Sequence, residues 1–290
     1  MNKILLALTV ILALSFTAKK FKMKNENLAY IPAGTFVLDK DTVSVMSMYM
    51  TKGEVTNGEY KVFLNDLITQ KRMKDYNVAK VDTLLWSNTL KHGKPYVYHY
   101  FNHPAYSNYP VVNISKQGAE LYCEWYTKKM NIKYETKGHK FQRFRLPMKE
   151  EWVYAAKGGL KHSPYPWGGP YTRNTNGGYL ANFAHVGDRN IKRNKNGEFV
   201  IVSNDEFQYS YDNSHAMSDI LAPSKSYFPN GYGLYNMAGN VNEMIADKDI
   251  VMGGDWRSGG FDIRVISEKP LIKPSPLTGF RMVSTYVPVR

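Results

Sequence analysis

The chain of 290 residues has one cysteine, Cys123, so a disulfide within the chain is impossible. Its apolar stretch 4–16 is too short to span a bilayer comfortably, and no later stretch qualifies. Acidic residues are the minority charge, with 25 Asp and Glu against 38 Lys and Arg, giving a net charge of +13. Dense basic runs occur only at 19–24 and 192–195, without a nucleic-acid-binding motif. We therefore expect no nucleic-acid partner, and the basic surface favours an acidic protein or peripheral membrane contact.

The beginning of the chain has the features of an export signal. Lys3 gives a positive start, the apolar run follows, and small residues stand at Ser15 and Ala18. We predict a signal peptide over 1–18, a polar linker over 19–28 and one folded domain over 29–290. An uncleaved membrane anchor is the alternative. The expected location is the periplasm or the outer-membrane periphery of a Gram-negative bacterium.

Helical signals are few and far apart. Thr56 and Glu59 form a capping box, a hydroxyl and a carboxylate that satisfy free amide groups, before a helix with apolar spacing. Ser115 begins a second helix over 116–130, which places Cys123 on its apolar face as a buried structural thiol. A third helix follows Pro147. Residues 70–109 and 160–235 are expected to be irregular, so the fold class is α+β with little regular structure.

Nine phrases, in one order along the chain, carry a resemblance. They are similar to the formylglycine-generating enzyme family, also called the sulfatase-modifying factor family, from about residue 29 to 284. The phrases are IPAGTFVL, GEVTNGEYKVFL, YPVVNISKQGAELYCEW, RFRLPMKEEWVYAAKGG, YPWGG, LANF, NGYGLYNMAGNVNEM, MGGDW and GFRMV. The resemblance implies a single loop-rich domain related to C-type lectins. VDTLLW and YFNHPAYSNYPVV further resemble inserts in the gliding-motility lipoproteins K and J of Bacteroidota, which serve type IX secretion.

The resemblance also implies that the oxidase chemistry of this family is missing. The oxidases bind copper through two cysteine thiolates after the Gly-Gly-x-Trp frame, because thiolate suits Cu(I). Those positions are Ser258 and Ile263 here. The Ser before the frame's Trp is replaced by Asp255, and the Trp of the GN-x-W-E motif by Asn242. We expect no copper, and we expect His99 and His103 to be ordinary polar or stacking residues rather than metal ligands.

The resemblance implies that the chain has kept a structural calcium site. The family's calcium loop matches Asn236 and Glu243 as side-chain ligands, with carbonyls from Gly239 and Val241. A turn held by hydrogen bonds is the alternative. A second family calcium site matches Asn182 and the carbonyl of Phe183, and its missing acidic ligand is sought in Asp205 or Asp219.

Three functions remain open from the sequence. The first is a non-catalytic scaffold or assembly protein of the bacterial envelope, with an envelope protein as partner and a link to gliding motility or type IX secretion. The second is a metal-dependent oxidase with an altered site. The third is a glycan-binding module, by analogy with lectins and on the strength of 22 Tyr and five Trp.

Overall fold

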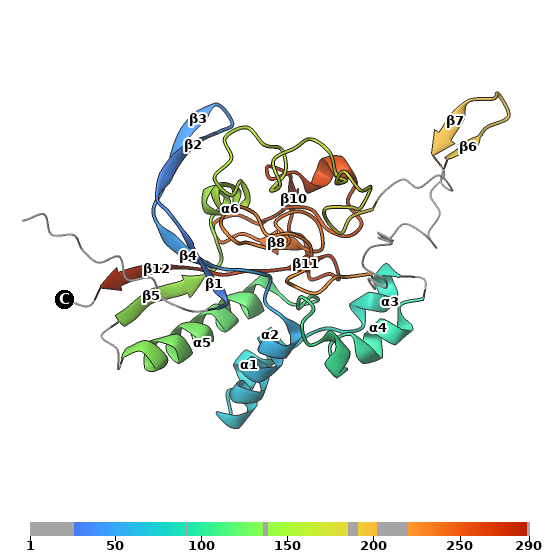
Figure 1. Cartoon of the computed structure of the whole chain (residues 1–290). Helices are drawn as coiled ribbons and strands as arrows, with labels where there is room; N and C mark the ends of the chain where they lie inside the picture. Colours follow the sequence, from blue (N-terminus) through green and yellow to red (C-terminus); the bar gives the residue numbers. More distant parts are fainter. Residues whose placement is uncertain (1–25, 91, 136–138, 185–190, 202–219, 289–290) are drawn as a thin grey trace, which may run out of the picture.

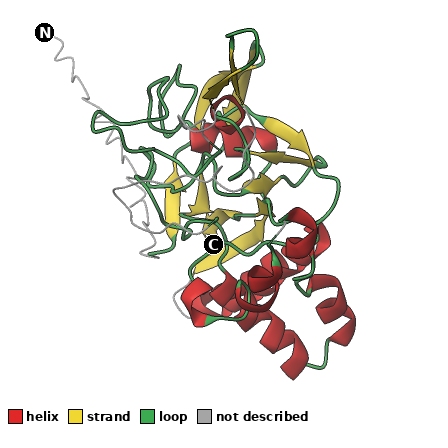
Figure 2. Ribbon diagram, turned by 90° about the vertical axis from the view of Figure 1, so that its right-hand side faces the viewer, coloured by secondary structure: helices red, strands yellow, loops and turns green. Residues whose placement is uncertain are grey.

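The computed structural model describes residues 26–90, 92–135, 139–184, 191–201 and 220–288. The predicted signal peptide lies outside these ranges, as does most of the predicted linker. No helix of the described residues has both the length and the apolar character that crossing a membrane requires. The described segments form a mixed helix-and-sheet domain, in which most helices gather on one side and the strands and long loops on the other (Figures 1 and 2).

A four-stranded antiparallel sheet organises the molecule, in the order β1-β4-β12-β5. Its strands come from both halves of the chain. The chain's first and last described strands therefore lie in one sheet, with β12 paired to β4 on one side and to β5 on the other. The bounds are β1 Leu28–Ile31, β4 Met48–Thr51, β5 His139–Arg145 and β12 Val283–Pro288.

Both faces of this sheet are covered, which explains why β1 and β4 are almost continuously buried. Successive side chains of a strand point to opposite faces. Leu28 and Tyr49 accordingly pack into a core with the helices, whereas Ala29, Met48 and Met50 pack into a second core on the other face.

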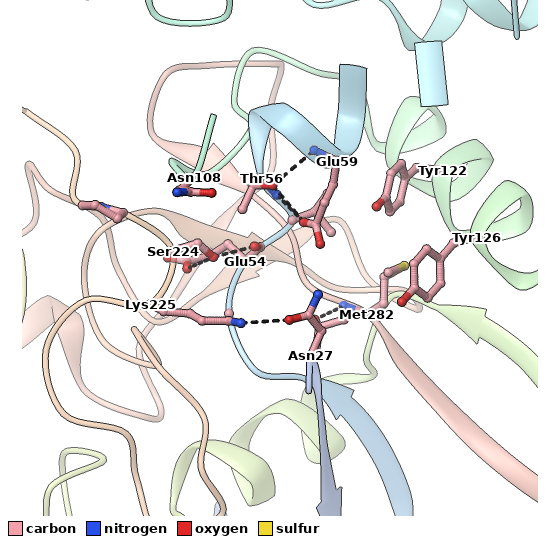
Figure 3. A pocket seen from close by; sticks show the side chains of 14 residues that line it. Asn27, Glu54, Thr56, Glu59, Asn108, Tyr122, Tyr126, Ser224, Lys225 and Met282 are labelled. Atoms are coloured by element: carbon pink, nitrogen blue, oxygen red, sulfur yellow. Dashed lines mark hydrogen bonds between the residues drawn. The ribbon is translucent and has the colours of Figure 1, made fainter. Parts of the chain in front are cut away.

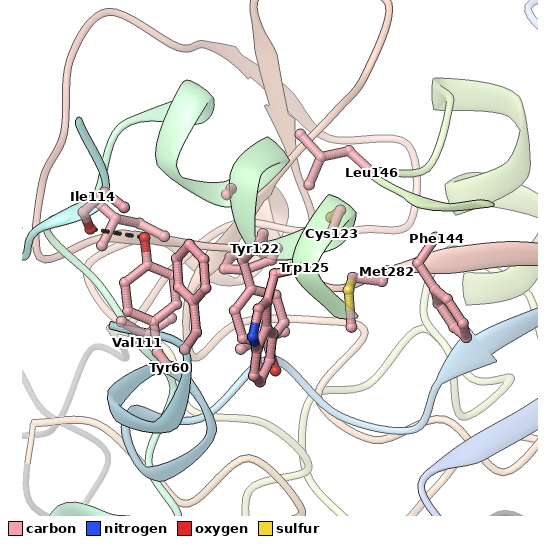
Figure 4. Packing of buried hydrophobic residues seen from close by; sticks show 14 of the residues in the cluster. Tyr60, Val111, Ile114, Tyr122, Cys123, Trp125, Phe144, Leu146 and Met282 are labelled. Atoms are coloured by element: carbon pink, nitrogen blue, oxygen red, sulfur yellow. Dashed lines mark hydrogen bonds between the residues drawn. The ribbon is translucent and has the colours of Figure 1, made fainter. Parts of the chain in front are cut away.

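The first core is aromatic and is supplied mainly by α1 (Asn57–Thr69) and α5 (Lys116–Glu135). The predicted capping box is present, since Thr56 N donates to Glu59 Oε2 and Glu59 N donates to Thr56 Oγ1. Ser115 Oγ accepts from Gly118 N at the start of α5, as expected. Tyr60 and Tyr122 stack with ring centroids 5.5 Å apart, and Cys123 is buried among their neighbours (Figure 4).

The prediction that 70–109 is irregular was wrong. This segment contains three short helices and a 3₁₀ turn. Their apolar residues are mostly aromatic and lack a sustained helical period, so the sequence hides them. Trp86 stacks with Tyr96 and meets Tyr100 at a tilt, each at 4.9 Å between ring centroids, and these contacts hold the helices together. The bounds are α2 Met73–Ala79, α3 Leu85–Thr89, α4 Lys94–His99 and η1 Pro104–Tyr106.

A second sheet, in the order β10-β9-β8-β11, lies beyond the second core. Its β8 and β11 pair in parallel and its other pairs are antiparallel. Helix α6 (Lys149–Ala156) supplies Trp152 and Val153 to the same core. The strand bounds are β8 Asn242–Met244, β9 Ile250–Met252, β10 Glu268–Pro270 and β11 Thr278–Gly279.

The remaining strands form two separate hairpins, and loops make up most of the rest. The first hairpin pairs β2 with β3 and the second pairs β6 with β7. Of residues 160–235, the described parts contain only β6 and β7 as regular elements, which confirms the low regular content that the sequence predicts there. The bounds are β2 Gly34–Leu38, β3 Asp41–Val45, β6 Ile191–Arg193 and β7 Phe199–Ile201.

Candidate functional site

The candidate site is built on a sharp turn after β9. Gly253 and Gly254 have φ angles of 87° and 70°, which lie in the left-handed region where side chains are disfavoured. A Cβ on Gly253 would also lie 2.9 Å from the ring of Trp152, and one on Gly254 would collide with the carbonyl oxygen of Asp262. Only glycine fits both positions. The turn directs Asp255 and Trp256 into the interior, where both are buried.

A closed polar cluster fills the inner side of this turn. Ser258 Oγ accepts from Asp255 N at 3.0 Å, and Asn242 Nδ2 donates to Asp255 Oδ2 at 3.0 Å. Lys269, from β10, reaches both groups. Its ammonium lies 2.6 Å from Ser258 Oγ and 3.2 Å from Asp255 Oδ2. The buried carboxylate is therefore neutralised by a lysine of the same chain.

The second expected position, Ile263, lies on the other side of the turn. It belongs to the 3₁₀ helix η3 (Gly260–Ile263), is fully buried, and has its Cγ2 close against Gly254. It packs with Tyr165 and Phe183 in an apolar cluster. The structure thus brings all four residues expected from the resemblance to one turn, and it adds Lys269. The sequence carries no signal for Lys269, because its place depends on the pairing of β10 with β9.

The expected calcium residues lie beside a buried ion pair. Glu243 accepts from Arg281 through both carboxylate oxygens, at 2.6 Å each, and from Trp152 Nε1 at 2.7 Å. Asn236 has a left-handed φ of 52°, and its Nδ2 donates to Glu54 Oε2 and to the carbonyl of Pro223. Its buried Oδ1 has no hydrogen-bond partner among the described residues.

This arrangement fits calcium in part. Asn236 offers a buried amide oxygen that needs a partner, which suits a hard cation. The carboxylate of Glu243 already balances the charge of Arg281, so it has little negative charge left for an ion. Gly239 and Val241 are also buried in the same loop. Across the described ranges, no three or more His, Cys, Asp or Glu side chains are grouped to hold a metal.

Glu54 is a buried carboxylate with a raised pKa that the sequence did not predict. It is buried, with Oε1 accepting from Asn240 Nδ2 and Oε2 accepting from Ser224 Oγ and Asn236 Nδ2. Burial raises the pKa of its carboxyl to about 7, against the lowering effect of nearby Arg281. Glu54 stands two residues before the Thr56 cap, and the helix-start signal there masks any separate role.

The residues of the second expected calcium site meet the first loop. A Cβ on Gly239, whose φ is 72°, would collide with the carbonyl oxygen of Asn182. That carbonyl accepts from Asn240 N at 2.7 Å, and Asn182 Nδ2 donates to Asn240 Oδ1. Phe183 is buried in the apolar cluster of Ile263. The expected acidic partners, Asp205 and Asp219, lie outside the described residues.

The two histidines lie between the end of α4 and the start of η1. His99 ends α4, and its ring lies 6.1 Å from that of His103 at nearly a right angle. His103 Nδ1 accepts from Ala105 N at the start of η1. The two rings thus meet edge to face, and His103 also caps η1.

Comparison with known proteins settles the family. The profile of the sulfatase-modifying factor enzyme 1-like domain matches residues 15–286. The chain belongs to this family. The family's formylglycine-generating enzyme from Mus musculus is 26% identical over 257 residues, 75% of this chain and 57% of that protein. The one from Thermomonospora curvata is 34% identical over 151 residues, 52% of this chain and 36% of that protein. The chain therefore spans well under two-thirds of the length of these curated relatives.

One relative carries a name that bears on chemistry. The inactive C-alpha-formylglycine-generating enzyme 2 from Bos taurus is 31% identical over 158 residues, which is 51% of this chain and 38% of that protein. Solved structures share the fold at lower identity. PvdO from Pseudomonas aeruginosa has a TM-score of 0.53 at 17% identity and covers 89% of this chain and 93% of its own. CarF has a TM-score of 0.54 at 16% identity, covering 88% and 97% respectively.

Proposed function

We propose that this family member is non-catalytic and works as an exported scaffold or assembly protein of the bacterial envelope. Its partner is an envelope protein, and its role is linked to gliding motility or type IX secretion. The observation that carries the non-catalytic part is the Lys269 ammonium held between Asp255 and Ser258. Similarity to a relative named as inactive gives further support.

The physical argument concerns charge and ligand softness. Cu(I) binds thiolates and thioethers, whereas an alcohol and a hydrocarbon, Ser258 and Ile263, offer it no suitable donor. An ammonium 2.6 Å from Ser258 Oγ also repels any cation that approaches that oxygen. The carboxylate of this cluster is paired within the chain, with its cation supplied by Lys269.

Copper titration tests the non-catalytic part. Purified protein, titrated with Cu(I) against a chromogenic chelator, should bind no stoichiometric copper and should take up no oxygen with a cysteine-containing peptide. The double variant Ser258→Cys with Ile263→Cys should gain Cu(I) affinity. A matched control, Ser226→Cys with Ile266→Cys, adds two thiols elsewhere and should bind copper far more weakly. Stoichiometric copper or peptide-dependent oxygen uptake in the natural protein would instead establish the altered oxidase.

Genetic complementation tests the envelope role. Deleting the gene should impair gliding or type IX secretion in the source bacterium. The variants Lys269→Met and Ser258→Ala should restore normal gliding and secretion to the deletion strain if no catalysis takes place at the turn. Full secretion and motility in the deletion strain would contradict the proposed role. Loss of complementation by a stably produced Ser258→Ala protein would contradict the non-catalytic part.

We also propose structural calcium at Asn236, with the carbonyls of Gly239 and Val241 and the carboxylate of Glu243 as further ligands. The unpartnered Oδ1 of Asn236 supports this proposal. Because Arg281 neutralises Glu243, we expect weak affinity, on the order of 10⁻⁴–10⁻³ M, as in extracellular calcium modules. Millimolar calcium should raise the melting temperature, and EDTA should reverse the rise. The variant Asn236→Ala should lose this response, and an unchanged response would contradict the assignment.

A further inference from the structure

A cavity of about 460 Å³ lies apart from the turn that carries Ser258. Its wall is formed by the connection from β4 to α1, by α5, and by the loop that contains Pro223 and Ser224 (Figure 3). The volume is within the range typical of small-molecule sites. Its lining is polar on one side and aromatic on the other. The residues used below are Asn27, Glu54, Glu59, Tyr122, Tyr126 and Lys225.

Glu59 supplies the negative charge of the cavity. Its Oε2 accepts from both the backbone N and the Oγ1 of Thr56, which fixes the carboxylate in place. No described residue donates to its other oxygen. In Figure 3 the carboxylate points away from α1 into the cavity. A fixed carboxylate with one open oxygen is a ready acceptor for a charged donor.

Tyr122 supplies a second acceptor beside it. The residue is 1% exposed, and it lines the cavity. Burial, and then the charge of Glu59, raises the pKa of this phenol. The hydroxyl points toward the cavity in Figure 3, and the ring of Tyr126 stacks 6.1 Å away. A phenolic hydroxyl at the wall of a cavity can accept a hydrogen bond from a ligand.

The other charges of the cavity set the polarity of the ligand. Glu54 also lines it, but Arg281 lies close enough to act on its charge and its oxygens accept from Ser224, Asn236 and Asn240. Lys225 is exposed at the edge, where its ammonium donates to Asn27 Oδ1 at 2.8 Å. The site therefore has a negative, aromatic interior and a positive edge.

We propose that this cavity binds a small zwitterion, a compound with a primary ammonium at one end and a carboxylate at the other. The ammonium donates to Glu59 and to the hydroxyl of Tyr122, with the rings of Tyr122 and Tyr126 beside it. An ammonium has three donors and no acceptor, which matches this set of groups. The carboxylate of the ligand meets Lys225. This binding function goes beyond the envelope role proposed above and does not depend on it.

Calorimetry on the full exported chain tests the proposal with probes of graded length. The probes are β-alanine, 4-aminobutyrate and 6-aminohexanoate, with hexylamine and hexanoate as compounds of single charge. At least one zwitterion should bind ten-fold or more tightly than either singly charged compound. The proposal would be overturned if no zwitterion bound more tightly than both hexylamine and hexanoate.

Variants locate the binding. Glu59→Gln keeps the helix cap, because glutamine also serves in a capping box, but it removes the charge. It should weaken zwitterion binding ten-fold or more. Lys225→Gln and Tyr122→Phe should each weaken it several-fold, and the latter removes only the hydroxyl. Glu124→Gln changes an exposed carboxylate of α5 that does not line the cavity and should leave binding unchanged. Unaltered binding in a folded Glu59→Gln protein would also overturn the proposal.

Discussion

Arg281 and Glu243 form a paired contact in which both guanidinium-to-carboxylate hydrogen bonds are 2.6 Å long and neither side chain reaches solvent. Arg281 also donates to the carbonyls of Thr51, Lys52 and Tyr235. One side chain thereby joins the end of β4, the loop before β8 and the segment that enters β12. The pair therefore links the main sheet to the loop before β8.

Removing this arginine should strongly destabilise the fold. In Arg281→Met the carboxylate of Glu243 stays buried without a counter-charge, which costs about 3–5 kcal/mol in comparable cases. The free energy of unfolding from urea titration measures the loss. Arg143→Met removes an exposed pair with Glu124 and should cost less than about 1 kcal/mol. If the two variants lost similar amounts of unfolding free energy, burial would not govern how much an ion pair stabilises this fold.

Glu54 should make stability fall as the pH rises. Its pKa is about 7 in the folded chain against 4.5 for an unperturbed carboxyl, so the folded state binds the proton more tightly. Protonated Glu54 contributes its full stabilisation below pH 4.5. This contribution decreases as the pH rises to about 7, and the free energy of unfolding does not change further on account of Glu54 above that pH. Unfolding free energies at several pH values between 4.5 and 8 should show this decline relative to Glu54→Gln, which has no titrating group there. Parallel curves for the two proteins would contradict it.

Threonine at position 148 should stabilise α6. Met148 already has the N-cap conformation, with φ −73° and ψ 161°, and its N donates to Glu151 Oε2 at 2.9 Å. It lacks only a side-chain oxygen for the free amides of the first turn. Met148→Thr should therefore raise the unfolding free energy by about 1 kcal/mol. Met148→Val has a similar shape without the oxygen and should give no gain in thermal melts, so an equal gain would rule out capping as the cause.

Cys123 should be inert in the folded protein. It is buried, and burial raises the pKa of its thiol far above the usual range, so thiolate is scarce at neutral pH. A chromogenic thiol reagent should react with one equivalent per chain only after the protein is unfolded in denaturant. Glu124→Cys places a thiol on the exposed face of the same helix and should react at once. Rapid reaction of the natural folded chain would show that α5 opens locally.

The local signals of the sequence predict much of the framework. Thr56 with Glu59, and Ser115 before α5, act as expected because capping depends on residues three positions apart. The family resemblance located Asp255 and Ser258 at one turn. Lys269 escaped prediction because its contact requires two strands to pair. Glu54 escaped because its partners, Asn236 and Asn240, are more than 180 residues away. The short helices of 70–109 escaped because tertiary aromatic contacts, rather than a periodic apolar face, hold them.

The position of β12 has a consequence for how the chain acquires its fold. This strand occupies an inner place in the main sheet, between β4 and β5, although more than 130 residues separate it from either partner. Ribosomal synthesis delivers those partners long before residue 283 emerges, and until then the sheet has a gap at its centre. Such distant pairing makes folding slow. The main sheet can therefore close only after nearly the whole chain has been synthesised.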